Sequence, residues 1–280
     1  IQGLAELLPV SSSAHVVVAE KLMGMDPTAP AMTLLLVMLH TGTMIAVIAY
    51  FWRQWRRTYF NSVGGFATIV PQLIVATVAT GVIGYGLKEV IEKFVLHTNH
   101  AQIEELFGRL NWIAPALAAV GILILIAGLT EKRRRPVPAE EESSATGLNM
   151  KQAGWIGAVQ GLALPFRGFS RSGSTISTGM LLGAAKTRAE EFSFALAVIL
   201  TPPVVAREIW RLRKAQHIVG AGNLAAAMGP SLLGALVAFL AGLVALKWLS
   251  RWLESGRWWW FGVYCLIAAG AVEYLYRIGY

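Results

Sequence analysis

Long apolar stretches without Asp, Glu, Lys or Arg dominate the chain and alternate with short charged segments. Each long stretch meets or approaches the roughly 20 residues that an α-helix needs to cross a bilayer. None shows the alternation of polar and apolar positions, over about ten residues, that is typical of a membrane β-strand. The pattern therefore predicts six membrane-spanning helices, over residues 27–52, 58–87, 110–130, 192–206, 215–246 and 258–272.

Two further apolar segments, residues 1–22 and 151–185, are interrupted by Pro, Gly and Ser and carry ionisable residues. Broken helices of this kind persist at membrane depth only where protein or a water-filled cavity surrounds them. We expect each segment to form a re-entrant helix–loop–helix element. The predicted fold is an all-α integral membrane protein with about six transmembrane helices and two re-entrant elements.

Residues 131–146 combine a basic run, two prolines and a run of three glutamates, which predicts a charged cytoplasmic linker. This linker divides a single membrane domain, residues 1–280, into halves at 1–130 and 147–280, each with three spans and one broken element. An odd number of spans per half gives the halves opposite topology, as in inverted repeats. The sequence Gln-Gly-Leu-Ala occurs in both broken elements, beginning at Gln2 and at Gln160.

Composition and charge narrow the class of protein further. Hydrophobic residues make up 55% of the chain and charged residues 14%, against about 25% charged in an ordinary soluble domain. The single cysteine, Cys265, excludes an internal disulfide. In so apolar a chain, the net charge of +8 indicates cytoplasmic loops and anionic headgroups or substrates rather than nucleic acid. Lys and Arg number 13 on the side opposite the termini and 9 on the terminal side, which predicts that the termini lie outside.

The first broken element carries a cluster of polar residues around Pro9. Gln2 and Glu6 are four positions apart and share a helix face, and the residues Ser11, Ser12, Ser13 and His15 follow the proline. A carboxylate at membrane depth indicates a functional site. Taken singly, the glutamate could snorkel from a span end, the serines could bond the preceding turn and the histidine could be a packed interior residue. The clustering favours function.

The second broken element offers a turn rich in Arg, Gly and hydroxyl groups that opens into an apolar helix. Its polar positions are Arg167, Gly168, Ser170, Arg171, Ser172 and Thr175. Free N–H groups at a helix N-terminus together with Arg form an anion site, and phosphate is the usual ligand. The alternatives are an Arg that snorkels to a headgroup and small residues that only allow close helix packing.

Together the two elements supply the groups that phosphoryl transfer requires. These are a hydroxyl nucleophile, an acid or base, a carboxylate for a divalent metal and a guanidinium for developing charge. Glu6 has few acidic companions, which suggests Mg²⁺ held jointly with the phosphates of the substrate. No zinc-type Cys and His cluster occurs. His40 lies in mid-span and either assists the site or packs in the interior.

These motifs resemble the undecaprenyl-diphosphatase family, the bacitracin-resistance-type membrane phosphatases of bacterial cell-wall synthesis. The resemblance rests on Gln2 and Glu6 followed by Leu-Pro-Val-Ser-Ser and His15, on residues 168–175, and on Glu-Glu-Phe-Ser-Phe from Glu190. Arg167 stands where the family has proline. The resemblance implies hydrolysis of undecaprenyl diphosphate to the monophosphate with Mg²⁺ or Ca²⁺. It also implies a multi-pass protein of the bacterial plasma (inner) membrane whose site opens to the outer, periplasmic face.

The resemblance also implies a role for each polar residue. Ser12 resembles the nucleophile and His15 its acid/base partner, although either could be the attacking group. Glu6 and Gln2 would serve the metal and the diphosphate, with Glu6 and Arg171 also in the catalytic set. The remaining substrate-binding expectations are Ser11, Ser13, Arg167, Gly168, Ser170, Ser172 and Thr175.

A lipid-phosphate transporter or flippase is the alternative function, because inverted repeats with broken helices are also transporter architecture. A flippase has no use for a nucleophile beside an acid/base group, so the proximity of Ser12 and His15 in the sequence favours the enzyme. The expected partners are the lipid substrate and the bilayer, with no nucleic acid. The oligomeric state is left open, with a homodimer among the expectations.

Overall fold

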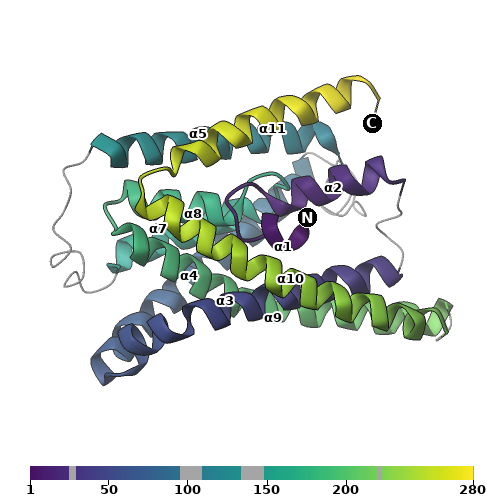
Figure 1. The fold of residues 1–280 in the computed structure, drawn as a ribbon, viewed down its shortest axis with the longest axis horizontal. Helices are drawn as coiled ribbons and strands as arrows, with labels where there is room; N and C mark the ends of the chain where they lie inside the picture. Colours follow the sequence, from purple (N-terminus) through teal and green to yellow (C-terminus); the bar gives the residue numbers. More distant parts are fainter. Residues whose placement is uncertain (25–29, 95–108, 134–147, 220–221, 280) are drawn as a thin grey trace.

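The computed structural model describes residues 1–24, 30–94, 109–133, 148–219 and 222–279, and throughout these residues the regular structure is helical. The elements are α1 (Gln2–Ala5), α2 (Ser12–Leu22), α3 (Pro30–Trp55), a π-helical turn η1 (Arg56–Phe60), α4 (Val63–Phe94), α5 (Leu110–Arg133), α7 (Met150–Ala163), α8 (Arg171–Leu181), α9 (Lys186–Val219), α10 (Gly222–Glu254) and α11 (Trp259–Arg277). Helices α5 and α11 lie side by side along one side of the molecule (Figure 1). Helices α3, α9 and α10 pack together along the opposite side (Figure 1).

Five of the described helices are long and apolar enough to cross a membrane. They cover Met32–Phe60, Val63–Phe94, Leu110–Arg133, Lys186–Trp210 and Met228–Glu254. With the helical secondary structure, they confirm the prediction of an all-α integral membrane protein. The sixth predicted span, at 258–272, forms the helix α11, which is not among the five. Its Trp and Tyr residues lower its hydropathy, and such side chains favour the membrane interface.

Two predicted boundaries differ from the structure. Residues 215–219, expected to begin the span at 215–246, instead belong to the end of α9, and α10 begins at Gly222. Because this stretch carries no charged residue, the pattern gave no sign of a helix end and assigned residues 215–219 to the following span. The predicted linker at 131–146 begins inside α5, which ends at Arg133, and its remaining positions lie outside the described residues.

Both predicted re-entrant elements are broken helices. Residues 6–11 separate α1 from α2, and residues 164–170 separate α7 from α8. Pro9 and Pro165 lie in these breaks, where a proline removes a backbone donor and cannot continue a helix. Each break ends in an unusual backbone conformation, with φ of 65° at Ser11 and 105° at Gly168. The chain therefore turns sharply just before α2 and just before α8.

The first arm of each broken element packs against a long helix of the other half of the chain. Helix α1 packs on α10, and α7 packs on α4. The glycines of the two Gln-Gly-Leu-Ala sequences lie at these contacts: a Cβ on Gly3 would be 2.8 Å from Ala238 Cα, and one on Gly161 would be 2.7 Å from the Thr80 carbonyl oxygen. Small residues permit such close helix contacts. The equivalence of the two halves as inverted repeats stays a prediction.

Helices α3 and α9 pack against each other and carry buried aromatic side chains at their contact. Phe51 and Phe194 are fully buried, and their ring centroids lie 5.4 Å apart in a stacked arrangement. Stacked aromatic pairs of this kind add to the stabilisation that comes from apolar burial. This contact fixes the separation of α3 and α9, which form the walls of the pocket described below.

Candidate active site

The Glu6 carboxylate lies at the break after α1 and is the centre of the polar cluster. It accepts hydrogen bonds from Gln2 Nε2 at 3.0 Å, from Ser12 Oγ at 2.5 Å and from Arg171 Nη2 at 3.2 Å. Its side chain is only 17% exposed. Ser12 and Gln2 share Oε2, and Arg171 faces Oε1. The structure thus brings together four residues that the sequence placed in two separate motifs.

Arg171 is the first residue of α8, and the preceding Ser170 caps this helix by accepting a hydrogen bond from the Gly173 N–H at 3.2 Å. Its Nη2 forms the ion pair with Glu6, while its Nη1 is buried and has no hydrogen-bond partner among the described residues. Buried donors without a partner are rare in proteins. The guanidinium therefore retains a donor that an incoming anion could occupy.

The other hydroxyl groups at the start of α8 already have protein partners. Ser172 Oγ donates to the Leu8 carbonyl at 3.3 Å, and Thr175 Oγ1 donates to the Arg171 carbonyl at 2.8 Å and lies 2.6 Å from Ser193 Oγ. The Ser172 and Thr175 side chains are buried. In this structure these groups fix α8 against the first broken element and against α9, which holds Arg171 in place.

The two loops touch at Gly168. The Gly168 N–H donates to Ser13 Oγ at 3.4 Å, and Ser13 Oγ lies 3.2 Å from Ser11 Oγ. A Cβ at Gly168 would stand 2.6 Å from the Ile113 carbonyl oxygen, and its φ of +105° is strained for any residue with a side chain. Ser11 adopts a positive φ without being glycine, and such backbone strain concentrates at functional sites.

The two histidines nearest the cluster lie in different environments. His15 Nδ1 lies 2.8 Å from the Ser11 carbonyl oxygen and His15 Nε2 lies 2.6 Å from the Tyr264 hydroxyl. His40 Nδ1 lies 2.8 Å from the Leu36 carbonyl. His40 Nε2 lies 3.2 Å from Gln2 Nε2 and 3.9 Å from Glu6 Oε2.

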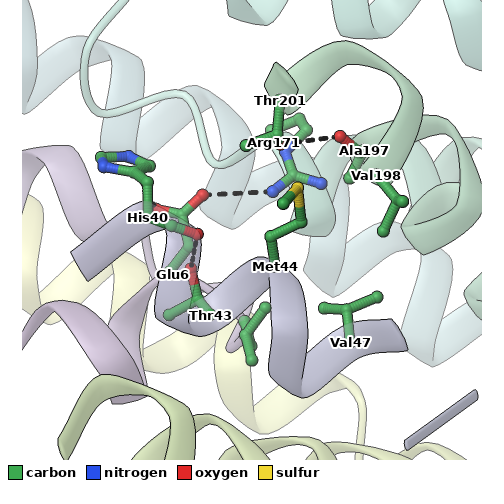
Figure 2. Close-up of a pocket in the computed structure, with 10 residues that line it drawn as sticks. Glu6, His40, Thr43, Met44, Val47, Arg171, Ala197, Val198 and Thr201 are labelled. Atoms are coloured by element: carbon green, nitrogen blue, oxygen red, sulfur yellow. Dashed lines mark hydrogen bonds and ion pairs between the residues drawn. The ribbon is translucent and has the colours of Figure 1, made fainter. Parts of the chain in front are cut away.

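A pocket opens beside this cluster between α3 and α9 (Figure 2). Figure 2 shows Glu6 and Arg171 joined across it, with His40 beside Glu6. Its lining residues are Glu6, Leu7, His40, Thr43, Met44, Val47, Arg171, Ala197, Val198 and Thr201. One part of this lining is polar and the other is apolar. Apart from His40 in mid-span, no signal in the sequence indicates the walls from α3 and α9.

Arg167 lies away from that pocket lining and interacts electrostatically with Glu20 of α2. Glu20 is buried and was absent from the predicted site. Its position in the apolar part of a short helix gives no indication from sequence alone that it faces the second broken element. The two arginines of the turn therefore have different carboxylate partners.

The donor atoms of the cluster suit a hard cation. No group of three or more His, Cys, Asp or Glu residues that could hold a metal occurs among the described positions. The oxygen donors here are the Glu6 carboxylate, toward which Gln2 turns its amide nitrogen, and the Ser12 hydroxyl, 2.5 Å from Glu6 Oε2. Mg²⁺ and Ca²⁺ prefer such oxygen ligands and complete their coordination with phosphate oxygens and water, whereas zinc prefers Cys and His.

Comparisons with known proteins show the family of this chain. The sequence profile of the family described as bacitracin resistance protein BacA matches residues 1–271. Undecaprenyl-diphosphatase 2 of Acinetobacter baylyi is 52% identical, over 97% of this chain and 93% of its own length. Undecaprenyl-diphosphatase of Desulfosudis oleivorans is 34% identical, over 98% and 95% of the two chains. Undecaprenyl-diphosphatase 1 of Burkholderia pseudomallei is 34% identical, over 96% and 91%.

Proposed function

The chain belongs to the bacitracin resistance protein BacA family, and on this premise we propose that it hydrolyses undecaprenyl diphosphate to undecaprenyl phosphate and inorganic phosphate. This reaction returns the carrier lipid to cell-wall synthesis and confers resistance to bacitracin. The observation that carries the proposal is the pair of contacts made by the Glu6 carboxylate. One oxygen accepts a hydrogen bond from the Ser12 hydroxyl at 2.5 Å, and the other accepts one from Arg171 at 3.2 Å.

Ser12 is the proposed nucleophile. Its hydroxyl already donates to Glu6 Oε2, and a serine becomes nucleophilic when an adjacent base accepts its proton. The Ser12 oxygen forms a bond to the terminal phosphorus, the bridging P–O bond breaks, and the hydroxyl proton passes to Glu6. The lipid monophosphate leaves. Water then attacks the phosphorus of the phosphoserine and releases inorganic phosphate. The proton on Glu6 returns to the Ser12 oxygen, and the proton lost by the water leaves with the phosphate.

His15 is the alternative attacking group and the proposed acid/base partner. Its Nε2 is bonded to Tyr264 rather than to Ser12 in this structure. Catalytic hydrogen bonds are often incomplete until substrate binds, so the observed contact is compatible with a role in either step. Trapping of a phosphoenzyme would separate phosphoserine from phosphohistidine, because phosphoserine survives acid and phosphohistidine does not.

Arg171 is the proposed clamp for the charge on the diphosphate. Its Nη2 donates to Glu6, and its buried Nη1 has no partner within the part of the chain that the structure describes. A preorganised guanidinium that faces developing charge costs no reorganisation during the reaction. Ser170, Ser172 and Thr175 hold the turn that presents it.

Mg²⁺ or Ca²⁺ is the proposed cofactor, held by Glu6 and Gln2 together with the phosphates of the substrate. When bound, such an ion neutralises part of the diphosphate charge and makes the terminal phosphorus easier to attack. Gln2 Nε2 faces Glu6 and His40, so its carbonyl oxygen is the atom of that side chain available as a ligand.

The protein is multi-pass, and we further propose that it lies in the bacterial inner membrane with the active site open to the periplasm. Single cysteines would test this, because the only native one, Cys265, is buried. With the termini outside, an impermeant maleimide should label Met23→Cys in intact cells and Ser255→Cys only after permeabilisation. The reverse pattern would contradict the orientation. Chemical crosslinking of the same samples would test the expected homodimer.

Purified protein should release phosphate from undecaprenyl diphosphate in the presence of Mg²⁺ or Ca²⁺, and a chelator should stop the release. Undecaprenyl monophosphate is the matched control substrate and should release no phosphate. Absence of hydrolysis with metal present would contradict the proposed function. If the same protein nonetheless moved a fluorescent lipid phosphate across vesicle bilayers, the transporter alternative would replace it.

A further inference from the structure

His15 is held at both ring nitrogens, by the backbone of its own loop and by the last helix of the chain. Nδ1 lies 2.8 Å from the carbonyl oxygen of Ser11, and Nε2 lies 2.6 Å from the hydroxyl of Tyr264. A carbonyl oxygen only accepts, so Nδ1 carries the hydrogen. In the neutral imidazole Nε2 is then the acceptor, and the Tyr264 hydroxyl donates to it.

Tyr264 lies on a helix that is fixed against the first broken element. Its neighbour Cys265 is fully buried and donates its Sγ–H to the Pro9 carbonyl oxygen at 3.3 Å. Helix α11 packs along α5, where a Cβ on Gly262 would be 2.7 Å from the Gly121 carbonyl oxygen. Two consecutive residues of α11 thus contact the loop that carries the proposed nucleophile.

The two rings are also parallel. The centroids of the His15 and Tyr264 rings lie 5.7 Å apart with 11° between their planes. The ring contact restricts rotation of the imidazole about its Cβ–Cγ bond, while the Ser11 carbonyl, which only accepts, leaves Nε2 as the acceptor. The hydrogen bond between them is exposed, and Tyr264 retains 45% of its surface. A lipid headgroup could therefore reach His15 Nε2 without rearrangement of the core.

We propose that Tyr264 is a positioning residue for the phosphatase reaction, acting through His15. The Ser11 carbonyl sets the Nδ1–H tautomer, and the Tyr264 hydroxyl holds the ring in place through Nε2 until the substrate replaces it there for proton transfer. This inference rests on the proposed function, because it assigns a further residue to the same site. Nothing in the sequence motif predicts it, since 249 positions separate the two residues.

Tyr264→Phe removes the hydroxyl and keeps the stacked ring. We expect kcat to fall about tenfold, the size of effect typical of one hydrogen bond, while KM stays within about twofold and the melting temperature is unchanged. Tyr276→Phe is the matched control, because Tyr276 lies on the same helix and is similarly exposed, at 46%. Its kcat should equal that of the unmodified protein. An unchanged kcat for Tyr264→Phe would overturn the proposal.

A double variant tests whether Tyr264 acts through His15. In a His15→Gln background, Tyr264→Phe should change kcat by less than about twofold, because residues that act as a unit are not additive. A full tenfold loss in that background would show that Tyr264 acts independently, and would overturn the proposal.

Nitrogen NMR of protein with ¹⁵N-labelled histidine gives a readout that needs no turnover. The His15 resonances are identified as those lost in His15→Gln. In Tyr264→Phe the Nε2 resonance of His15 should shift from that of a hydrogen-bonded acceptor toward that of a free one, and the other histidines should be unchanged. No shift would overturn the inference even if the phosphatase activity is present. A shift without any phosphate release by the unmodified protein would support the contact and refute the proposed function instead.

Discussion

The guanidinium of Arg171 lies 3.2 Å from the carboxylate of Glu6, although 165 positions separate the two residues in the chain. One comes from the break between α1 and α2 and the other from the first turn of α8. The two broken elements thus contribute to a single polar cluster. The predictions below test what each side of this contact contributes.

Arg171→Lys should lose most turnover. Lysine offers a point charge without the planar fork, so it cannot pair with Glu6 and present a second donor at once. The expected loss in kcat corresponds to about 2–4 kcal/mol of transition-state stabilisation, the scale for one preorganised donor. Steady-state kinetics on undecaprenyl diphosphate would measure it. Arg277→Lys, which alters an exposed pair with Glu273, should leave kcat unchanged.

Arg167→Ala should behave differently. Arg167 interacts electrostatically with Glu20 rather than with Glu6. It also occupies the position where the family motif has proline. If it contacts phosphate, its loss removes binding that is equal in the ground and transition states, so KM should rise while kcat changes little. An equally large loss of kcat at both arginines would mean that Arg167 has taken over part of the catalytic role.

Ser12→Ala should abolish hydrolysis, with a loss of at least about a thousandfold in kcat, because removal of a nucleophile normally costs several orders of magnitude. The hydroxyl is the group bonded to Glu6 at 2.5 Å, and alanine leaves that carboxylate in place. Ser255→Ala is a suitable control, because its hydroxyl donates to the Trp252 carbonyl oxygen at 3.2 Å in an exposed turn. Activity of Ser12→Ala within about tenfold of the unmodified protein would point to His15 or water as the attacking group.

Glu6→Gln should weaken metal binding together with activity, because an amide keeps the shape of the side chain but removes the negative charge that Mg²⁺ requires. Binding of Mn²⁺, measured by electron paramagnetic resonance, reports on the metal without any turnover. Glu273→Gln, on the exposed end of α11, should bind as the unmodified protein does. Normal Mn²⁺ affinity and normal kcat in Glu6→Gln would contradict the metal-binding role and would indicate that Glu6 only snorkels from the end of a span.

Gly157→Ala should destabilise the packing of α7 on α4 by at least about 2 kcal/mol, in the range of overpacked cores. Its Cβ would stand 2.2 Å from the Ala76 carbonyl oxygen, which is backbone and cannot move aside. Gly154→Ala, three residues earlier, places its Cβ at an ordinary 3.7 Å from Val75 Cγ1 and should be neutral. A thiol-reactive dye measures both, because the buried Cys265 reacts only on unfolding. Equal melting curves for the two variants would contradict the packing argument.

The helical membrane class could be predicted because hydropathy and chain length act locally. A run of about 20 apolar residues satisfies its backbone hydrogen bonds as a helix wherever it lies in the bilayer. Both broken elements could be predicted for the same reason, since Pro9 and Pro165 interrupt a helix regardless of what surrounds them. The boundary between α9 and α10 could not, because residues 215–219 carry no charge to mark it.

The amino-acid sequence by itself determined which chemical groups are present and in which broken element they lie: Glu6, Ser12 and His15 in the first, and Arg171 in the second. Tertiary structure alone decided which of these groups meet. It paired Ser12 with Glu6 instead of His15, and it turned His15 toward Tyr264. The walls of the pocket likewise come from the crossing of α3 and α9. Contacts between distant segments follow from how whole helices pack, and small residues set how closely the helices approach. The spacing of the motifs along the chain therefore does not indicate how the helices pack.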